Sequence, residues 1–338
     1  ETAVVTKDSV WVTNREGVPI TKKVFEVNWD AGAAEKGGYE HFMCKEIYEQ
    51  PKAIRETMSA RLAKDDSAVI IDELNWSKEY LSSISKIFIV ACGTAYHAGF
   101  VGKYYIEKLA RIPVEVDIAS EFRYRSPILD ESTLTIVISQ SGETSDTLAA
   151  LKEAKRLGSK TMAITNVVGS SIAREADQVV YTWAGPEIAV ASTKAYTTQL
   201  ITVFMLATYM AGLKETISAD YAKSLISSLR KVPAQISEIL EDVEPIKTFA
   251  QQYGFNEDVF FIGRSLDYAV ALEGSLKLKE ISYIHAEAYA AGELKHGTLA
   301  LIVDGVPVIA LATQKSVYEK TLSNIKEVKA RDAVVIGI

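Results

Sequence analysis

Short apolar runs, each followed by a turn and a helical segment, recur along most of this chain, and this alternation most limits its fold. The run Lys86-Ile-Phe-Ile-Val-Ala91 leads into Cys92-Gly-Thr-Ala95 and then into a helical pattern over 96–110. Wholly apolar strands of this kind are typical of parallel sheets that helices cover on both faces. The pattern therefore predicts a doubly wound α/β fold.

The same alternation continues beyond this first strand and helix. Further strands are expected at 113–118, 134–138, 160–164 and 178–182, and helices at 144–157, 192–212 and 217–241. The last two helices are expected to lead out of the first α/β unit.

The pattern then starts again in the last third of the chain. Val259-Phe-Phe-Ile262 is a second buried run, and Gly263-Arg264-Ser265 turns it into a helix over 267–280. Aligning Gly93 with Gly263, an offset of 170 residues, superimposes strand, turn and helix. With strands expected at 306–310 and 333–337 and a helix at 315–330, we predict two duplicated, flavodoxin-like copies of one domain. The second copy is expected to stop early, with only its first strands.

The first residues of the chain follow a different pattern. Val10-Trp-Val12 and Val24-Phe-Glu-Val27 flank the turn signals of 14–17, which predicts short antiparallel strands too few to form a core of their own. The small residues of 31–38 are typical of a linker, and a helix interrupted by Pro51 is expected over about 40–63.

These patterns divide the chain into five parts. We expect 1–40 to be the remnant of a preceding domain with its linker, 41–83 connecting helices, 84–215 the first copy, 216–243 a connecting helix, and 244–338 an incomplete second copy.

Charge and cysteine content exclude several classes of function. The net charge of −7 leaves no basic surplus for a nucleic-acid partner, so none is expected. The most apolar helical run, 200–213, is too short for a membrane span, and no signal peptide is visible, so a cytoplasmic location is expected. Cys44 and Cys92 have no metal-binding spacing and no HxxxH or HExxH pattern occurs, so we expect no metal.

The strongest local signal is Ser139-Gln-Ser-Gly-Glu-Thr144, at the junction of a buried strand and a helix. Three hydroxyls, a glycine that admits close backbone approach and the free N–H groups of a helix start together favour a phosphate site without a lysine. The alternative is a simple N-capping turn. Two similar turns, Cys92-Gly-Thr-Ala95 and Val190-Ala-Ser-Thr193, are each more typical of helix caps when taken alone.

The second copy carries titratable residues instead of hydroxyls. Lys277 and Glu280 are three residues apart on one helix, which is consistent with a surface ion pair or with a buried pair that places a base for proton abstraction. Apolar neighbours favour the buried pair. The stretch His285–Gly297 is rich in titratable side chains, and His296, in what we expect to be a flexible segment, is the better candidate for moving a proton. His41 and His97 are interpreted as ordinary helix residues.

These segments together resemble the sugar isomerase (SIS) domains of the glucosamine-6-phosphate synthase family. The resemblance rests on Ser139–Thr147, Val190–Tyr196 and Glu273 through Gly297, with Glu46-Ile-Tyr-Glu-Gln-Pro51 matching the segment that opens the family's isomerase half. It covers nearly the whole chain. The family converts fructose 6-phosphate and glutamine to glucosamine 6-phosphate and glutamate, and it needs no metal or organic cofactor.

The resemblance implies a substrate site built from the three turns. Its residues are Cys92, Gly93, Thr94, Ser139, Gln140, Ser141, Thr144, Val190, Ala191 and Ser192. Those of the 139–144 turn hold the phosphate, with Thr94 nearby, and those of the 190–192 turn line the sugar.

The resemblance also implies three catalytic residues. Glu280 is the base that moves a proton between C1 and C2, Lys277 lies beside it, and His296 opens the sugar ring. In the family this histidine comes from the neighbouring subunit, which implies a homodimer whose interface is part of the active site.

The chain departs from the family pattern in several places. Ala95 stands where a serine is usual. A C-terminal tail bearing the lysine that forms a Schiff base would follow Ile338, and a glutaminase domain would come first, whose nucleophilic cysteine neither Cys44 nor Cys92 replaces. We therefore expect this chain to bind sugar phosphate without making glucosamine 6-phosphate from glutamine. Another phosphosugar isomerase or deglycase on the same scaffold, and a non-catalytic sugar-phosphate sensor, remain as alternatives.

Overall fold

The computed structural model describes residues 1–22, 24 and 35–338. They divide into two compact units, Glu1–Asp30 and Ala31–Ile338. The first unit contains an antiparallel sheet of β1 (Thr2–Val5), β2 (Val10–Thr13) and β3 (Pro19–Ile20). Its second turn is closed by Asn14, whose Oδ1 accepts the amides of Glu16 and Val18. The antiparallel strands are thus confirmed, while residues 25–27 of the strand expected at 24–27 and residues 31–34 of the linker expected at 31–38 lie outside the described residues.

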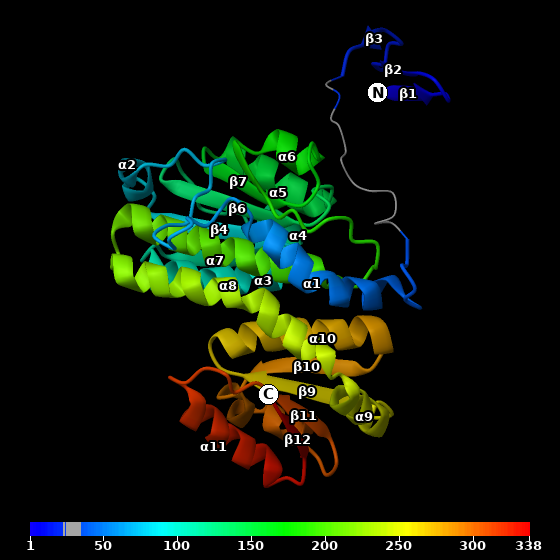
Figure 1. Ribbon diagram of the computed structural model, residues 1–338, viewed down its shortest axis with the longest axis vertical. Coiled ribbons are helices and arrows are strands. Elements are labelled where there is room, and N and C mark those ends of the chain that lie inside the picture. Colours follow the sequence, from blue (N-terminus) through cyan, green and yellow to red (C-terminus); the bar gives the residue numbers. More distant parts are fainter. Residues whose placement is uncertain (23, 25–34) are drawn as a thin grey trace. The chain divides into compact units, whose positions relative to one another are not determined.

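The second unit begins with helices that lead into a five-stranded parallel sheet (Figure 1). The helices are α1 (Phe42–Met58) and α2 (Lys78–Ser82), and the strands are β4 (Lys86–Ala91), β5 (Val114–Ile118), β6 (Thr133–Ser139), β7 (Lys160–Thr165) and β8 (Gln178–Tyr181). The strand order is β5-β4-β6-β7-β8, all parallel. This is the order 2-1-3-4-5 of flavodoxin-like sheets, which confirms the predicted fold class.

Helices cover both faces of this sheet because successive strand residues point to opposite sides. Ile87 and Ile89 of β4 belong to a core shared with α3 (Gly93–Leu109) and α7 (Lys194–Lys214). Phe88 and Val90 belong to a second core on the other side. That second core includes residues of α4 (Ala119–Phe122), α5 (Ser145–Arg156) and α6 (Ser171–Glu175).

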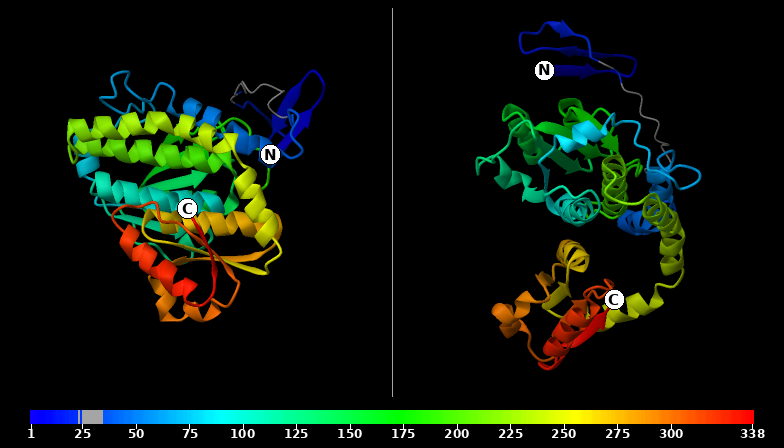
Figure 2. Two further views of the ribbon diagram at one scale, coloured as in Figure 1. Left: turned by 60° about the horizontal axis from the view of Figure 1, so that its bottom comes forward. Right: turned by 90° about the vertical axis from the view of Figure 1, so that its left-hand side faces the viewer.

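The chain then crosses to a second parallel sheet through α8 (Ala219–Glu241) and α9 (Glu244–Tyr253) (Figure 2). This sheet has four strands in the order β10-β9-β11-β12, which repeats 2-1-3-4 of the first sheet. Its elements are β9 (Asp258–Gly263), α10 (Leu266–Ser282), β10 (His285–Ala290), η2 (Glu293–His296), η3 (Thr298–Leu301), β11 (Pro307–Ala310), α11 (Tyr318–Lys329) and β12 (Val334–Gly337). The first helices of the two copies, α3 and α10, each have 17 residues and pack against each other. The predicted duplication is confirmed, but the predicted alignment is wrong: Gly263 ends β9, and the first helices align at Gly93 and Leu266, an offset of 173 residues and not 170.

Two local predictions are wrong. The helix expected over 40–63 was expected to break at Pro51, but α1 continues through Pro51 and ends at Met58. Ala60 has the positive φ of 60° that a continuing helix does not allow. No strand is expected in 285–297, yet this stretch contains β10 as well as the 3₁₀ turn η2. Because β10 is an edge strand, alanines such as Ala286 suffice to pack it, and they do not form an apolar run that the sequence reveals.

None of the helices in the described part of the chain has the length and apolar character needed to cross a bilayer.

Candidate functional site

A cavity of about 280 Å³ opens at the carboxyl ends of the first sheet's strands. Loops after β4, β6 and β8 line it, together with Gln199 of α7 and with Lys277 and Glu280 of α10. The loops after β4 and β6 leave the sheet where the strand order reverses, and open α/β sheets bind their ligands at such points. The cavity is therefore shared between the first copy and the first helix of the second.

Most of the site residues predicted from the sequence line this cavity. They are Cys92, Thr94, Ser139, Gln140, Ser141, Thr144, Val190, Ser192, Lys277 and Glu280. Three others do not line it. Gly93 lines a separate groove with Tyr96 and His97, Ala191 is buried, and His296 is exposed in η2.

The loop after β6 is held open toward the cavity by its own hydroxyls. Ser139 Oγ lies 3.0 Å from Thr144 Oγ1 and accepts the amide of Gly142 at 3.0 Å. Thr144 is the N-cap residue of α5, but its side chain makes no capping bond to that helix. The start of α5 therefore keeps free N–H groups and the positive end of the helix dipole beside a cluster of hydroxyls, which is the composition of a phosphate site.

Gly142 is required by the shape of this loop. Its φ is +65°, and a Cβ at this position would lie 2.0 Å from Ser170 Oγ. Only glycine therefore allows the loop to turn this tightly against the segment that follows β7.

On α10, Lys277 lies between two carboxylates. Its Nζ is 3.5 Å from Glu273 Oε1 and forms a closer ion pair with Glu280. The ion pair was expected to be buried, but the Glu280 side chain is 37% exposed while that of Lys277 is 18% exposed. Glu280 lies near the end of α10, where it faces the open cavity and not the helix packing.

A buried carboxylate that sequence analysis missed connects the two copies. Glu273 Oε1 accepts the hydroxyl of Thr94 at 2.9 Å, and its Oε2 lies 2.7 Å from His97 Nδ1. His97 was interpreted as an ordinary helix residue; instead it pairs across α3 and α10. Burial and the charge of Glu273 raise the pKa of Tyr196, whose hydroxyl has no partner among the described residues. The only signal in the sequence was the spacing of Glu273 and Lys277, four residues apart.

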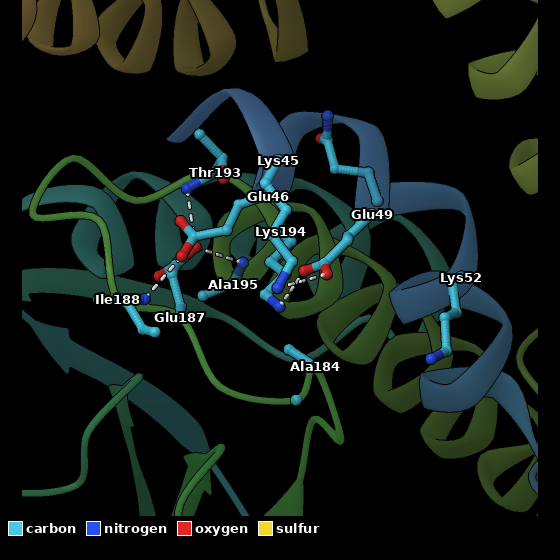
Figure 3. A network of polar contacts seen from close by, with 12 residues as sticks. Lys45, Glu46, Glu49, Lys52, Ala184, Glu187, Ile188, Thr193, Lys194 and Ala195 are labelled. Atoms are coloured by element: carbon cyan, nitrogen blue, oxygen red, sulfur yellow. Dashed lines mark hydrogen bonds and ion pairs between the residues drawn. The ribbon is translucent and has the colours of Figure 1, made fainter. Parts of the chain in front are cut away.

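A second missed carboxylate organises the loop after β8 (Figure 3). Glu187 Oε1 accepts the amides of Thr193 at 2.9 Å and Ala195 at 3.0 Å, and Oε2 accepts the hydroxyl of Ser192 at 2.9 Å. Burial raises the pKa of the Glu187 carboxyl, although these three hydrogen bonds oppose the rise. Glu187 itself lines the cavity.

The same loop is tied to α1. Glu46 of α1 is 2% exposed, and its Oε1 accepts the amides of Ile188 at 2.6 Å and Ala189 at 3.1 Å. Nearby, the buried Lys194 pairs with Glu49 of α1 at 2.6 Å (Figure 3). The loop has no regular secondary structure, but two carboxylates fix its backbone. Glu46 holds it at residues 188–189, and Glu187 holds it at residues 193–195.

Metal-binding clusters are not found in the described part of the chain, where no three His, Cys, Asp or Glu side chains gather around a common point. The site that the structure does assemble is one of hydroxyls, amides, one lysine and carboxylates.

Comparison with known proteins agrees with this architecture. The model of the SIS domain family matches residues 80–209 and 256–338, one match for each copy. The whole chain is 63% identical to a glutamine–fructose-6-phosphate aminotransferase [isomerizing] from Caldanaerobacter subterraneus subsp. tengcongensis and covers 55% of it. It is 60% identical to the protein of the same name from Clostridium tetani, again covering 55% of that relative.

A solved structure is also similar to this chain. The C-terminal domain of glucosamine-fructose-6-phosphate aminotransferase from Francisella tularensis superimposes with a TM-score of 0.85 at 44% identity, over 90% of this chain and 85% of that domain.

The doubled flavodoxin-like fold, with one cavity shared between its copies, defines a two-domain α/β protein with a candidate small-ligand site. Within that class, the chain belongs to the SIS domain family. It spans about half the length of the curated relatives it matches, at 55% of each.

Proposed function

We propose that this chain is the sugar-phosphate isomerase part of a glutamine–fructose-6-phosphate aminotransferase. The observation that carries the proposal is that the hydroxyl-rich 139–144 loop and Glu280 line one cavity although they come from different copies. The names of the relatives, which cover the whole of this chain, support the same activity. The substrate of this part is then fructose 6-phosphate, and the product in the intact enzyme is glucosamine 6-phosphate.

In this proposal the first copy binds the ligand's anionic end. Ser139, Gln140, Ser141 and Thr144 surround the phosphate, and the N-terminus of α5 supplies the favourable end of its dipole. Thr94 contributes from the neighbouring loop. The sugar then extends toward the loop after β8, where Val190 and Ser192 face the cavity and Ala191 supports them from the buried side.

The second copy supplies the proton transfer. Once ammonia has condensed with the C2 carbonyl of the open ketose and water has left, Glu280 removes a proton from C1 of the C2 imine and returns it to C2. The proton of the C1 hydroxyl ends on the nitrogen, which leaves an aldehyde at C1 and an amino group at C2. The Lys277 ammonium, held beside Glu280, stabilises the negative charge that develops on oxygen during this transfer. No metal or organic cofactor takes part in the proposed reaction.

We further propose a homodimer in which His296 reaches the cavity of the other subunit and opens the sugar ring. Two features support this. His296 is exposed, and it does not line the cavity of its own chain. The same proposal includes the division into five parts at residues 40, 83, 215 and 243, with the first part derived from a glutaminase domain. It also includes a cytoplasmic location.

Two solution measurements test the function. Titration calorimetry should show fructose 6-phosphate binding to the chain, and Ser141→Ala with Thr144→Ala should weaken that binding by at least roughly tenfold through loss of charge-assisted hydrogen bonds. In deuterium oxide, NMR should show exchange of the C1 proton. Binding without any exchange would favour the sensor, and no binding at all would contradict the proposal.

A further inference from the structure

The carboxylate of Glu187 lies inside the candidate cavity, where a negatively charged ligand is expected to bind. We propose that Glu187 is a specificity-determining residue. As a resident anion it occupies the N-terminus of α7, so that the ligand's phosphate is accepted only at the 139–144 loop. The inference rests on the proposed function and deepens it, because it states how the site selects which end of a ketose carries the phosphate.

A carboxylate of the protein itself already occupies the N-terminus of α7. A helix start offers unpaired amides and a positive dipole end to any anion within reach. At α7, the amides of the N-cap residue Thr193 and of Ala195 in the first turn both donate to Glu187 Oε1, at 2.9 and 3.0 Å. The hydroxyl of Ser192 donates to the other oxygen. An incoming phosphate would have to displace a carboxylate that already has three donors.

The start of α5, on the same cavity, has no capping bond from its N-cap side chain. This residue is Thr144, and the side chains of its loop that line the cavity are hydroxyls and an amide. Two helix starts therefore open on one cavity. One holds a protein carboxylate, and the other presents only neutral side chains to the cavity, since Asp146 in the first turn of α5 does not line it.

The loops that lead to α5 and α7 leave the sheet from two nearby strands. β6 and β8, the strands that lead to these two loops, are separated by β7 alone. With neighbouring strands about 4.8 Å apart, their ends are roughly 10 Å apart. A hexose phosphate can bridge this distance, so its two ends meet chemically different surroundings.

The other charged side chains at the cavity also disfavour a phosphate at the sugar end. Lys277 is the cation that lines it, but this lysine is paired with both Glu273 and Glu280. The α10 side therefore carries a net negative charge, and Glu187 adds to it at the sugar end. A phosphate placed there would meet like charges, which costs binding free energy.

Glu46 provides a way to separate charge from shape. It fixes the same loop through the amides of Ile188 and Ala189, but it does not line the cavity. Loss of Glu46 should loosen the loop and affect every ligand alike. Loss of the Glu187 charge should affect ligands according to where their phosphate lies.

The experiment compares two regioisomers, fructose 6-phosphate and fructose 1-phosphate, by calorimetry on the chain. The wild type should prefer the 6-phosphate. In Glu187→Gln this preference should fall by roughly tenfold, mainly because the 1-phosphate binds more tightly than before. Glu46→Gln should weaken both ligands by the same factor. Glu131→Gln removes one exposed charge on the turn before β6, at the opposite end of that strand, and should change neither affinity.

The outcomes separate this inference from the proposed function. If the wild type binds neither regioisomer, the function fails. If it binds the 6-phosphate, but Glu187→Gln weakens both ligands equally or the wild type shows no preference, the function stands and this inference is wrong. Should Glu187→Gln unfold by circular dichroism, Glu187→Asp keeps the charge and must retain the preference; loss of the preference in a folded Glu187→Asp would also overturn the inference.

Discussion

The two copies share a strand order and a helix length, but the loops at the same edge of their sheets differ. One loop is open to the cavity, and the other is occupied by a side chain of the protein. In the first copy the loop after β6 leaves its hydroxyls and the start of α5 to the cavity. In the second copy the corresponding loop, after β11, is filled by the protein itself. Asp267 Oδ2 accepts the amides of Thr313 at 2.9 Å and Gln314 at 3.3 Å, and Oδ1 accepts the hydroxyl of Thr313 at 2.5 Å.

One substitution accounts for much of this difference. Thr94 and Asp267 are each the second residue of the first helix of their copy, α3 and α10. Thr94 lines the cavity with a neutral hydroxyl, whereas Asp267 is 3% exposed and places a carboxylate on the neighbouring loop. Where the second copy supplies an internal anion, the first leaves the position for a ligand.

The copies consequently divide the work of one site. The first copy provides the anion-binding loop, and the second contributes the far end of α10 with Lys277 and Glu280. A duplicated fold with two equivalent sites would not need the α3–α10 contact through Glu273, whereas a divided site depends on it.

The largest expected effect comes from replacing glutamates at matched positions of α10 and α3, which tests the division of the site between the copies. Glu280 and Glu107 are each the fifteenth residue of α10 and α3. Glu280→Gln should lower the rate of C1 proton exchange by roughly 10²–10⁴-fold with little change in binding, because a general base is lost. Glu107→Gln removes the same group from the first copy and should leave the exchange rate unchanged, as measured by NMR in deuterium oxide. Equal losses in both variants would contradict the division.

A glycine substitution tests the loops themselves. Gly142 and Gln314 each lie four residues after the last strand residue paired with the central strand, Ile138 and Ala310. Gly142→Ala places a Cβ 2.0 Å from Ser170 Oγ at a positive φ, so it should cost about 1–3 kcal/mol and weaken fructose 6-phosphate binding by at least roughly tenfold. Gln314→Ala serves as the control for calorimetry and should bind normally. Normal binding by Gly142→Ala would show that this loop does not hold the phosphate.

The resident carboxylate of the second copy is expected to act on stability. Asp267→Ala leaves the amides of Thr313 and Gln314 without their acceptor, which should lower the free energy of unfolding by about 1–3 kcal/mol. Thr94→Ala should cost less stability, because Glu273 keeps His97 and Lys277. Denaturant unfolding measures both. A larger loss in Thr94→Ala would reverse the assignment of structural and ligand-facing roles.

The smallest effect concerns pH and the carboxylate in the first copy. Burial raises the pKa of Glu187, so its folded-state contribution to stability is present at low pH and is lost as pH rises through that raised pKa. The wild type should therefore lose stability relative to Glu187→Gln as pH increases from 4 upward. Urea unfolding at several pH values measures the difference, and a gain with rising pH would have the wrong sign.

The fold was largely accessible from the sequence because its strands are continuous apolar runs. The runs at 86–91 and 259–262 are buried on both faces, so their composition alone indicates parallel strands and exposes the duplication. β10 was missed for the opposite reason. As an edge strand it needs little apolar surface, and its alternating alanines and titratable residues do not form the apolar run that predicts a strand.

The site was accessible only where its residues are neighbours in the chain. The hydroxyls of 139–144 lie together in the sequence, so their purpose is visible there. Glu273 meets His97 across 176 residues, and Glu46 meets Ile188 across 142, and neither contact leaves a local pattern. Glu187 is only eight residues from Ala195, but its half-buried position near Glu46 of α1 is a property of the folded chain.

The division of one site between two copies is tested most directly by a crystal structure of this chain with fructose 6-phosphate. The account predicts the phosphate among Ser139, Ser141 and Thr144, with C1 and C2 of the sugar within hydrogen-bond reach of Glu280. A phosphate bound instead at Thr313 and Gln314, or a sugar remote from Glu280, would contradict it.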